Sequence, residues 1–211
     1  MTITEEQRKR FAGDGFLVLK GVLSGERLAK LTAECMSAWL AEKGEFDVEA
    51  TWLQNSLLPD IHHRSRLVCD YYFDGPLVGV AEQLVGPNIK GATSQLTFKL
   101  RGNTKPFGWH QDNGYGHLDP ATAISTLMAL DDADVENGCL WVLPGQHKNG
   151  LRSRFRRING RLQTETLPEA PSFDENDGTP LEVAAGTLVV LHGALPHYSE
   201  ANRSSKSRYA Y

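Results

Sequence analysis

The residues with the clearest chemical potential lie in the segment Phe107-Gly-Trp-His-Gln-Asp112. On a strand, side chains two positions apart point to the same side, so this spacing predicts that the imidazole of His110 lies beside the carboxylate of Asp112. Two histidines and one carboxylate on one face of an Fe(II) ion leave positions open for a chelating cosubstrate and O2, as in non-heme oxygenases. Because His-x-Asp is common by chance, this interpretation depends on a third ligand elsewhere in the chain.

Two histidines near the end of the sequence, His192 and His197, are candidates for the third ligand. Each is followed eleven residues later by an arginine, Arg203 and Arg208 respectively, so spacing does not choose between them. A histidine and an arginine that face each other across a hairpin need turn residues midway between them. Only the pair His197 and Arg208 has such a turn, Ala-Asn-Arg-Ser-Ser. We therefore expect His197 to be the ligand, Arg208 its cross-strand neighbour, and His192 a core or supporting histidine.

An arginine buried beside an iron site needs an anion. A guanidinium binds a carboxylate through two parallel hydrogen bonds, so a dicarboxylate cosubstrate would fit Arg208. Ser199 lies two residues after His197 and so on the same side of a strand, where its hydroxyl could donate to that carboxylate. An ordinary serine at a strand end explains Ser199 equally well.

These side chains must be positioned by a chain that begins with helices and continues with strands. Thr4 and Gln7 form a capping-box pattern at the start of the first helix. The apolar run 16–19, bounded by glycines, predicts a buried strand. Apolar residues at helical spacing and Pro/Gly boundaries predict further helices. The expected helices cover residues from about 5 to 12, a longer stretch after Ser24 with Leu28, Leu31, Cys35 and Trp39 on one face, and the segment between Pro76 and Gly86.

From residue 92 onward, short β-like runs are separated by Gly, Pro, Asn and Asp, a pattern typical of a β-sandwich or barrel. Asn159-Gly160 between two such runs is the strongest hairpin signal, and residues 168–180 are expected to form a surface loop. The predicted architecture is a mainly β, two-sheet core on which the helices pack, within one domain over residues 1–211. The main expected strands are 95–100, 124–130, 139–143 and 186–191.

The amino-acid composition limits the kinds of partner that the protein is expected to bind. The 211 residues are 40% hydrophobic and 23% charged, which suits one globular domain. A net charge of -4, from 26 acidic against 22 basic residues, gives no field to recruit nucleic acid. The three cysteines are widely spaced and the first ten residues are polar, so we expect no disulfide framework, membrane span or signal peptide. We expect a cytoplasmic protein, and the sequence leaves its oligomeric state open.

Several motifs carry a family resemblance. Trp109-His-Gln-Asp112, the run Asn137-Gly-Cys-Leu-Trp-Val-Leu-Pro-Gly-Gln-His-Lys148, and His197-x-Ser199-x-x-Asn202-x-Ser204-x-x-x-Arg208 resemble the phytanoyl-CoA dioxygenase family. This family of Fe(II)/2-oxoglutarate-dependent oxygenases includes ectoine hydroxylase. The opening Phe11-x-x-Asp14-Gly-Phe-Leu-Val18 is similar too, so the resemblance spans nearly the whole chain, with its motifs in the family's order.

The resemblance implies a double-stranded β-helix, the jelly-roll core of cupin-like enzymes. It also implies that His110, Asp112 and His197 bind Fe(II), and that Arg208 and Ser199 bind the distal carboxylate of 2-oxoglutarate. Lys99 stands near the position where relatives place a cosubstrate-contacting lysine. Asp112 retains the carboxylate that related halogenases replace with a small residue. The implied reaction is therefore hydroxylation of an unactivated C–H bond with O2, releasing succinate and CO2.

The substrate is less well defined by the sequence. The short chain leaves little room for lid insertions, so we expect a small molecule. Arginines clustered around Asn159-Gly160 are a candidate positive patch for an anionic substrate, although a solvated hairpin face is the commoner outcome. Loops before the core and segments beside the metal-binding strands supply candidates for the mouth of the site, although ordinary packing or surface exposure is the commoner explanation for each: Trp52, Gln54, Asn113, Tyr115, His117 and Trp141.

Two alternative functions remain open at this point. One is a metal-binding β-barrel without oxygenase activity that serves as a binding or regulatory module. The other is a cupin-type isomerase or hydrolase that uses the same three ligands with another metal, because ligand geometry alone does not fix the metal. Neither alternative needs Arg208 and Ser199 as a dicarboxylate clamp, so these two residues favour the oxygenase.

Overall fold

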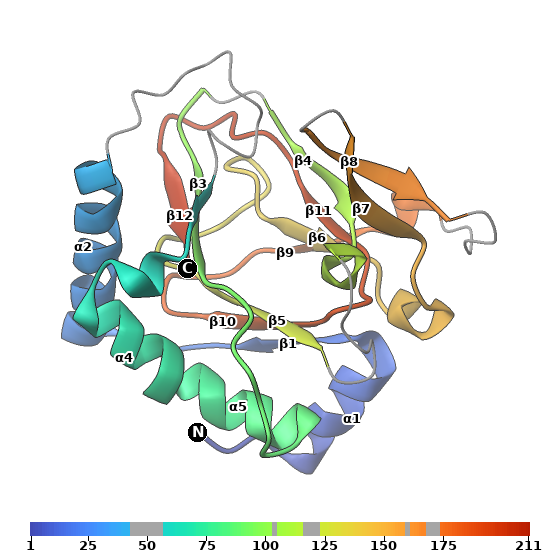
Figure 1. The fold of residues 1–211 in the computed structure, drawn as a ribbon, viewed down its shortest axis with the longest axis horizontal. Coiled ribbons are helices and arrows are strands. Elements are labelled where there is room, and N and C mark those ends of the chain that lie inside the picture. Colours follow the sequence, from blue (N-terminus) through green and yellow to red (C-terminus); the bar gives the residue numbers. More distant parts are fainter. Residues whose placement is uncertain (43–56, 103–104, 116–122, 159–160, 168–173) are drawn as a thin grey trace.

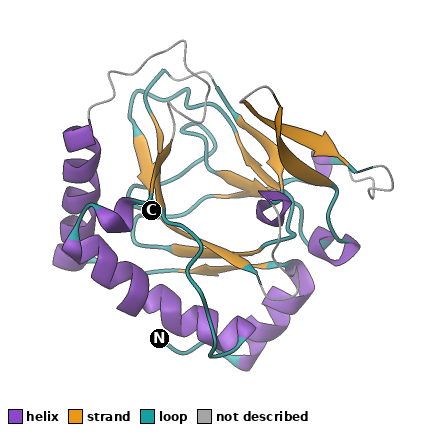
Figure 2. Cartoon of the chain, viewed as in Figure 1, coloured by secondary structure: helices purple, strands orange, loops and turns teal. Residues whose placement is uncertain are grey.

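The structure is a computed structural model that describes residues 1–42, 57–102, 105–115, 123–158, 161–167 and 174–211. Helices dominate the first part of the chain and strands the remainder, as the sequence predicts (Figures 1 and 2). The α-helices are α1 (Glu5–Asp14), α2 (Gly25–Glu42), α4 (Arg66–Asp74) and α5 (Pro76–Val85), and the short 3-10 helices are η1 (Ile61–His63), η2 (Asp112–Tyr115), η3 (Gln146–Asn149) and η4 (Glu175–Asp177).

Most of the strands form two facing layers. The first layer contains β1-β10-β5 and β12-β3-β2, which are joined by a bridge between Ala129 and Ala210. The second layer contains β4-β11-β6-β9, and β7 and β8 form a separate hairpin. The bounds are β1 (Phe16–Leu19), β2 (Leu57–Pro59), β3 (Gln95–Lys99), β4 (Phe107–His110), β5 (Ile124–Met128), β6 (Leu140–Val142), β7 (Ser153–Ile158), β8 (Arg161–Thr166), β9 (Thr179–Leu181), β10 (Leu188–His192), β11 (His197–Ser199) and β12 (Arg208–Ala210).

Strand β10 shows how the layers are held together. Its side chains alternate between two hydrophobic clusters. Leu188 and Val190 pack in the cluster that includes residues of α2, α4 and α5, whereas Val189 and Leu191 pack in the cluster shared with β6 and β9. Because both faces of β10 are buried, the strand is a continuous apolar run, which is why the sequence identifies it readily. The helices therefore cover the first layer and leave the second free to carry the site (Figure 1).

Local sequence signals agree with the observed elements in several places. Thr4 and Gln7 form the predicted reciprocal capping box at the start of α1, and the expected hairpin is present as β7 and β8. The expectation of a loop over 168–180 is wrong at its end, where β9 pairs with β6. The two-layer β core is confirmed, although its sheets are not closed into a barrel. No helix in the described part of the chain is long and apolar enough to cross a bilayer.

Candidate active site

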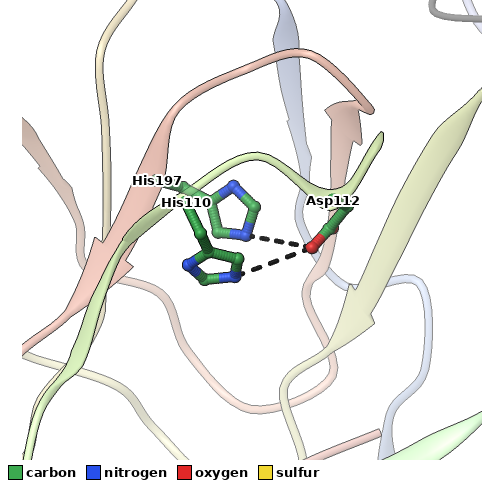
Figure 3. A group of neighbouring side chains, drawn as sticks. All are labelled: His110, Asp112 and His197. Carbon is green, nitrogen blue, oxygen red and sulfur yellow. Dashed lines mark ion pairs between the residues drawn. The ribbon is translucent and has the colours of Figure 1, made fainter. Parts of the chain in front are cut away.

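Three side chains from two distant parts of the sequence meet beside the second layer (Figure 3). Oδ1 of Asp112 lies 3.6 Å from Nε2 of His110 and 3.6 Å from Nε2 of His197. The candidate donor atoms all lie within 4.8 Å of one another. The two histidine side chains are 14% and 6% exposed, whereas that of Asp112 is 28% exposed, so the cluster opens toward solvent on one side.

Backbone carbonyls fix which nitrogen of each imidazole faces the cluster. Nδ1 of His110 lies 2.8 Å from the carbonyl oxygen of Gly108, and Nδ1 of His197 lies 2.9 Å from that of Leu195. A carbonyl oxygen only accepts hydrogen bonds, so each Nδ1 carries a proton. In the neutral ring the lone pair is then on Nε2, which points at Asp112. This is the arrangement that a metal-binding histidine requires.

The electrostatics of the cluster favour metal-binding protonation states. Burial lowers the pKa of His110 to about 4, and the neighbouring His197 adds to this shift. Burial opposes ionisation of Asp112, but His197, His110 and a hydrogen bond from Ser125 outweigh it, and the pKa of Asp112 is lowered. Near neutral pH His110 is a neutral imidazole and Asp112 is a carboxylate. Metal ligands of these two kinds must have those protonation states.

The structure corrects the reason given for placing Asp112 beside His110. Strand β4 ends at His110, and Asp112 begins the 3-10 helix η2, so the two side chains do not meet through strand alternation. Gln111, between them, is 2% exposed and anchors this change of direction. Its amide nitrogen donates to the carbonyls of Gly150 and Ala194, and its amide oxygen accepts from the backbone of Arg152. The role of Gln111 was not predicted from the sequence. Its position between two candidate ligands could have indicated that its amide supports them.

His197 and Arg208 do not face each other across a hairpin, so that prediction is wrong. His197 on β11 pairs with His110 on β4 and with Val142 on β6. Arg208 on β12 pairs instead with Lys99 on β3, in the first layer. The intervening segment crosses from one layer to the other rather than forming a two-stranded ribbon. Asn202 organises that crossing, because its amide donates to the carbonyls of Lys99 and Lys206.

Two buried cations lie side by side near the cluster. Arg208 and Lys99 are directly opposite each other on paired strands, with 7% and 2% of their surfaces exposed. The ammonium of Lys99 donates to the carbonyls of Ser199, at 3.2 Å, and Glu200. Burial, followed by the charge of Arg208, lowers the pKa of Lys99 to about 7, and burial lowers that of Arg208 to about 10. Ser199 shares the face of β11 on which His197 lies.

No carboxylate from the described residues lies within ion-pairing distance of these two cations. The guanidinium of Arg208 donates instead to the carbonyls of Asn137, at 3.4 Å, and Gly138, at 2.8 Å. Burying charged groups without a direct ion-pair partner is unfavourable, so the two cations fit an anion that binds from solution. The chemistry of this donor set matches a dicarboxylate next to a metal ion held by two imidazoles and a carboxylate.

The loop at Asn137-Gly138 is shaped to receive Arg208. The side chain of Asn137 bonds to the backbone of Asp134 and Asp132, which fixes the loop. Gly138 has φ +81°, and a Cβ atom there would collide with the carbonyl oxygen of Glu200 and lie 2.9 Å from Cδ of Lys99. Only glycine permits this close approach. The Asn-Gly pair of the sequence motif therefore has a structural role at the cation site.

Comparison with known proteins assigns the chain to a family. The sequence profile of the phytanoyl-CoA dioxygenase family (PhyH) matches residues 11–210. The chain belongs to the phytanoyl-CoA dioxygenase family. This confirms the predicted resemblance to the family and the predicted oxidoreductase class.

Curated members of the phytanoyl-CoA dioxygenase family differ in how fully the chain matches them. A phytanoyl-CoA dioxygenase of Arabidopsis thaliana is 35% identical over 151 residues, which cover 72% of this chain and 53% of that protein. Phytanoyl-CoA dioxygenase 1 of Oryza sativa subsp. japonica is 29% identical over an alignment of 250 positions, covering 99% of this chain and 87% of that protein. The match to the first relative thus spans about half of that relative's length.

Solved structures share the fold. The carbocyclase SnoK of nogalamycin biosynthesis superposes with a TM-score of 0.77 at 21% identity, covering 99% of this chain and 82% of that chain. EctD from S. alaskensis, solved with 2-oxoglutarate and 5-hydroxyectoine, superposes with a TM-score of 0.77 at 23% identity, covering 99% of this chain and 74% of that chain. These likenesses confirm the expected jelly-roll core.

The residues that were expected to line the mouth of the active site do not all lie beside the metal cluster. Asn113 is 2% exposed, and both polar atoms of its amide lack a hydrogen-bond partner among the described residues. Tyr115 ends η2 close to the cluster. Trp141 pairs with Tyr198 and so lies on the opposite sheet face from His197, which does not support a role at the mouth. Trp52, Gln54 and His117 lie outside the described residues.

Two further expectations concern His192 and the arginines of the hairpin. His192 ends β10 and its Nδ1 accepts from the backbone of Ala194, outside the metal cluster and consistent with a supporting role. Arg154 and Arg156 both pair with Glu165, and their side chains are 53% and 62% exposed. These two arginines therefore lie on a solvated face of the hairpin, and the idea that they form a positive patch for substrate is not supported.

Proposed function

We propose that residues 1–211 act as one domain and catalyse hydroxylation of a C–H bond in a small molecule, with 2-oxoglutarate as cosubstrate. In this proposal His110, Asp112 and His197 hold Fe(II), and Arg208, Lys99 and Ser199 hold the distal carboxylate of 2-oxoglutarate. The metal and the diacid supply the redox chemistry, in which decarboxylation to succinate and CO2 is coupled to transfer of an oxygen atom from O2 into the substrate.

The protein's own contribution is to set protonation states and positions. The carbonyls of Gly108 and Leu195 hold both imidazoles with Nε2 free. The carboxylate of Asp112 adds the one negative charge of the ligand set. The buried charges of Lys99 and Arg208 compensate a diacid that enters a largely dehydrated site, where electrostatic interactions are strong. Asn113 and Tyr115, which lie in the same 3-10 helix as Asp112, are proposed to face the substrate.

One observation favours this function over the two alternatives. A buried arginine that has no ion-pair partner among the described residues lies next to a buried lysine, close to the strand that carries His197. A structural metal site in a binding module, or a cupin-type isomerase or hydrolase, has no need of two buried cations. A dicarboxylate cosubstrate accounts for them.

The function is tested by anaerobic addition of Fe(II) and then 2-oxoglutarate. We expect a weak visible charge-transfer band from iron chelated by the diacid, followed by succinate release when air is admitted. Asp112→Ala should abolish both signals because it removes a ligand and the only carboxylate of the set. Arg208→Ala should weaken 2-oxoglutarate binding by at least about tenfold, given the strength of charged hydrogen bonds.

Arg203→Ala is the matched control for Arg208→Ala. The side chain of Arg203 is 76% exposed and, among the described residues, forms an ion pair with Glu200 alone, so its removal should leave the band and succinate release nearly intact. Absence of both the band and succinate in the wild-type protein would contradict the proposed activity. A product that contains no new oxygen atom would contradict hydroxylation while leaving the metal site in place.

A further inference from the structure

Two stacked aromatic rings cover one side of the metal cluster. The ring of Tyr115, at the end of η2, lies parallel to that of Phe155 on β7, with their centroids 3.8 Å apart and an angle of 10° between their planes. Phe155 also presents its ring to His110, at 6.0 Å and 71°, an edge-to-face contact. The pair therefore extends directly from a proposed iron ligand. Phe155 is contributed by the β7-β8 hairpin, which lies beside β4 and β11 in Figure 1.

The position of these rings suits a wall of the active-site mouth. Tyr115 is 48% exposed although it is a large aromatic residue, and Phe155 is half-buried. An exposed aromatic surface that continues into a catalytic site is typical of a binding surface rather than of core packing. Aromatic rings offer a flat apolar face, and they lose little conformational freedom when a ligand binds.

The described charges of the hairpin lie on its other face. Side chains alternate along β7, so Arg154 and Arg156 point away from the face that carries Phe155. Both pair with Glu165 on the outer surface. The cations Lys99 and Arg208 are assigned to the cosubstrate. The two rings themselves are uncharged, and neither Arg154 nor Arg156 lies on the face that carries them.

We propose that Tyr115 and Phe155 determine substrate specificity by binding a neutral, planar apolar group, which places the reacting C–H bond beside the metal. The inference rests on the proposed function of the metal centre and deepens it by naming the class of substrate. It also gives the β7-β8 hairpin a role, because the hairpin brings Phe155 to the site.

Binding of two matched probes tests the proposal. The protein is loaded with 2-oxoglutarate and with Mn(II), a redox-inert substitute for Fe(II) that speeds the relaxation of nearby protons. 2-Naphthylmethanol is the neutral probe and 2-naphthoate is its anionic counterpart. We expect the alcohol to bind about tenfold more tightly than the anion, because the rings of Tyr115 and Phe155 cannot compensate a buried charge. The ring protons of the bound alcohol should relax faster than those of the free alcohol, which would place the ring near the Mn(II) ion.

Phe155→Ala should weaken binding of the alcohol by about tenfold, as expected for loss of an aromatic contact and its buried area. Phe155→Leu retains an apolar anchor for the hairpin and should give a smaller loss, which separates recognition from folding of the hairpin. Tyr115→Phe keeps the ring and should bind like wild type. Arg156→Ala, on the same strand but the outer face, is the control and should change affinity less than about twofold.

The proposal is overturned if Phe155→Ala and Tyr115→Ala both bind the alcohol as tightly as wild type, or if the anion binds more tightly. Loss of Mn(II) binding in the wild type would instead contradict the proposed function. Saturation transfer from the metal-free protein to 2-naphthylmethanol then still tests the wall, since the stacked rings need no metal. Signal in wild type that is lost in Phe155→Ala supports it, and equal signals in both overturn it.

Discussion

Among single residues, Gln111 has a large structural role at the site, although it is not one of the three candidate metal ligands. Its amide links the backbone of Gly150, Arg152 and Ala194. These contacts join the turn after β4 to the base of the hairpin and to the segment that leads into His197. Gln111 therefore positions both arms of the ligand set without touching the metal.

Replacing Gln111 with Ala should lower metal affinity by about 10- to 100-fold, as loss of outer-shell support does in other metal sites. It should also lower the free energy of unfolding by about 1–3 kcal/mol, because buried backbone groups lose their partners. Mn(II) titration and urea unfolding measure the two effects. Gln146→Ala is the matched control, since its amide bonds only to Asn149 at the surface. Wild-type metal affinity in Gln111→Ala would contradict the positioning role.

Lys99 predicts how cosubstrate binding depends on pH. Burial and the charge of Arg208 lower the pKa of Lys99 to about 7, so the free site loses one cation as the pH rises through that value. A diacid binds better when Lys99 is protonated. Affinity for 2-oxoglutarate should therefore fall above about pH 7, by up to about tenfold per pH unit, as linkage to one proton requires.

Anaerobic titrations of the Fe(II) protein with 2-oxoglutarate between about pH 6 and 8.5 measure this dependence. In Lys99→Arg the side chain stays charged throughout, so the affinity should become nearly independent of pH. Equal pH slopes in wild type and Lys99→Arg would show that another group controls binding.

At the scale of elements, local patterns predict structure well and long-range pairing poorly. The capping box of α1, strand β1 and the β7-β8 hairpin follow from neighbouring residues alone. Helix α4 was missed, although Ser65 caps it by accepting from the backbone of Val68. His197 and Arg208 were expected to face each other across a hairpin, but they lie on strands of different layers, because turn propensity says nothing about which layer a strand joins.

The capping box of α1 gives a prediction at this scale. The hydroxyl of Thr4 accepts from the backbone of Gln7, and Gln7 returns a bond to the backbone of Thr4. Thr4→Ala should lower the free energy of unfolding by about 0.5–2 kcal/mol, measured by urea unfolding. Metal affinity should not change, because α1 contributes no ligand. Thr2→Ala, outside the helix, is the control, and an equal loss there would contradict the capping role.

At the scale of the whole molecule, the two layers bring the metal cluster and the cation pair together. β11 carries His197 in one layer, while β12 places Arg208 opposite Lys99 in the other. The types of side chain were readable from the sequence because metal and carboxylate chemistry restrict them. Their positions depend on strand pairings across nearly a hundred residues, such as that of His110 with His197, which no local pattern encodes.

We expect one iron ion and one diacid to occupy this junction between the layers. Anomalous diffraction from crystals grown anaerobically with Fe(II) and 2-oxoglutarate would locate both. We expect a single iron peak bonded to Nε2 of His110, Nε2 of His197 and a carboxylate oxygen of Asp112, with the far carboxylate of 2-oxoglutarate on Arg208. An iron peak that lacks any of these three ligands, or a diacid bound away from Arg208, would contradict it.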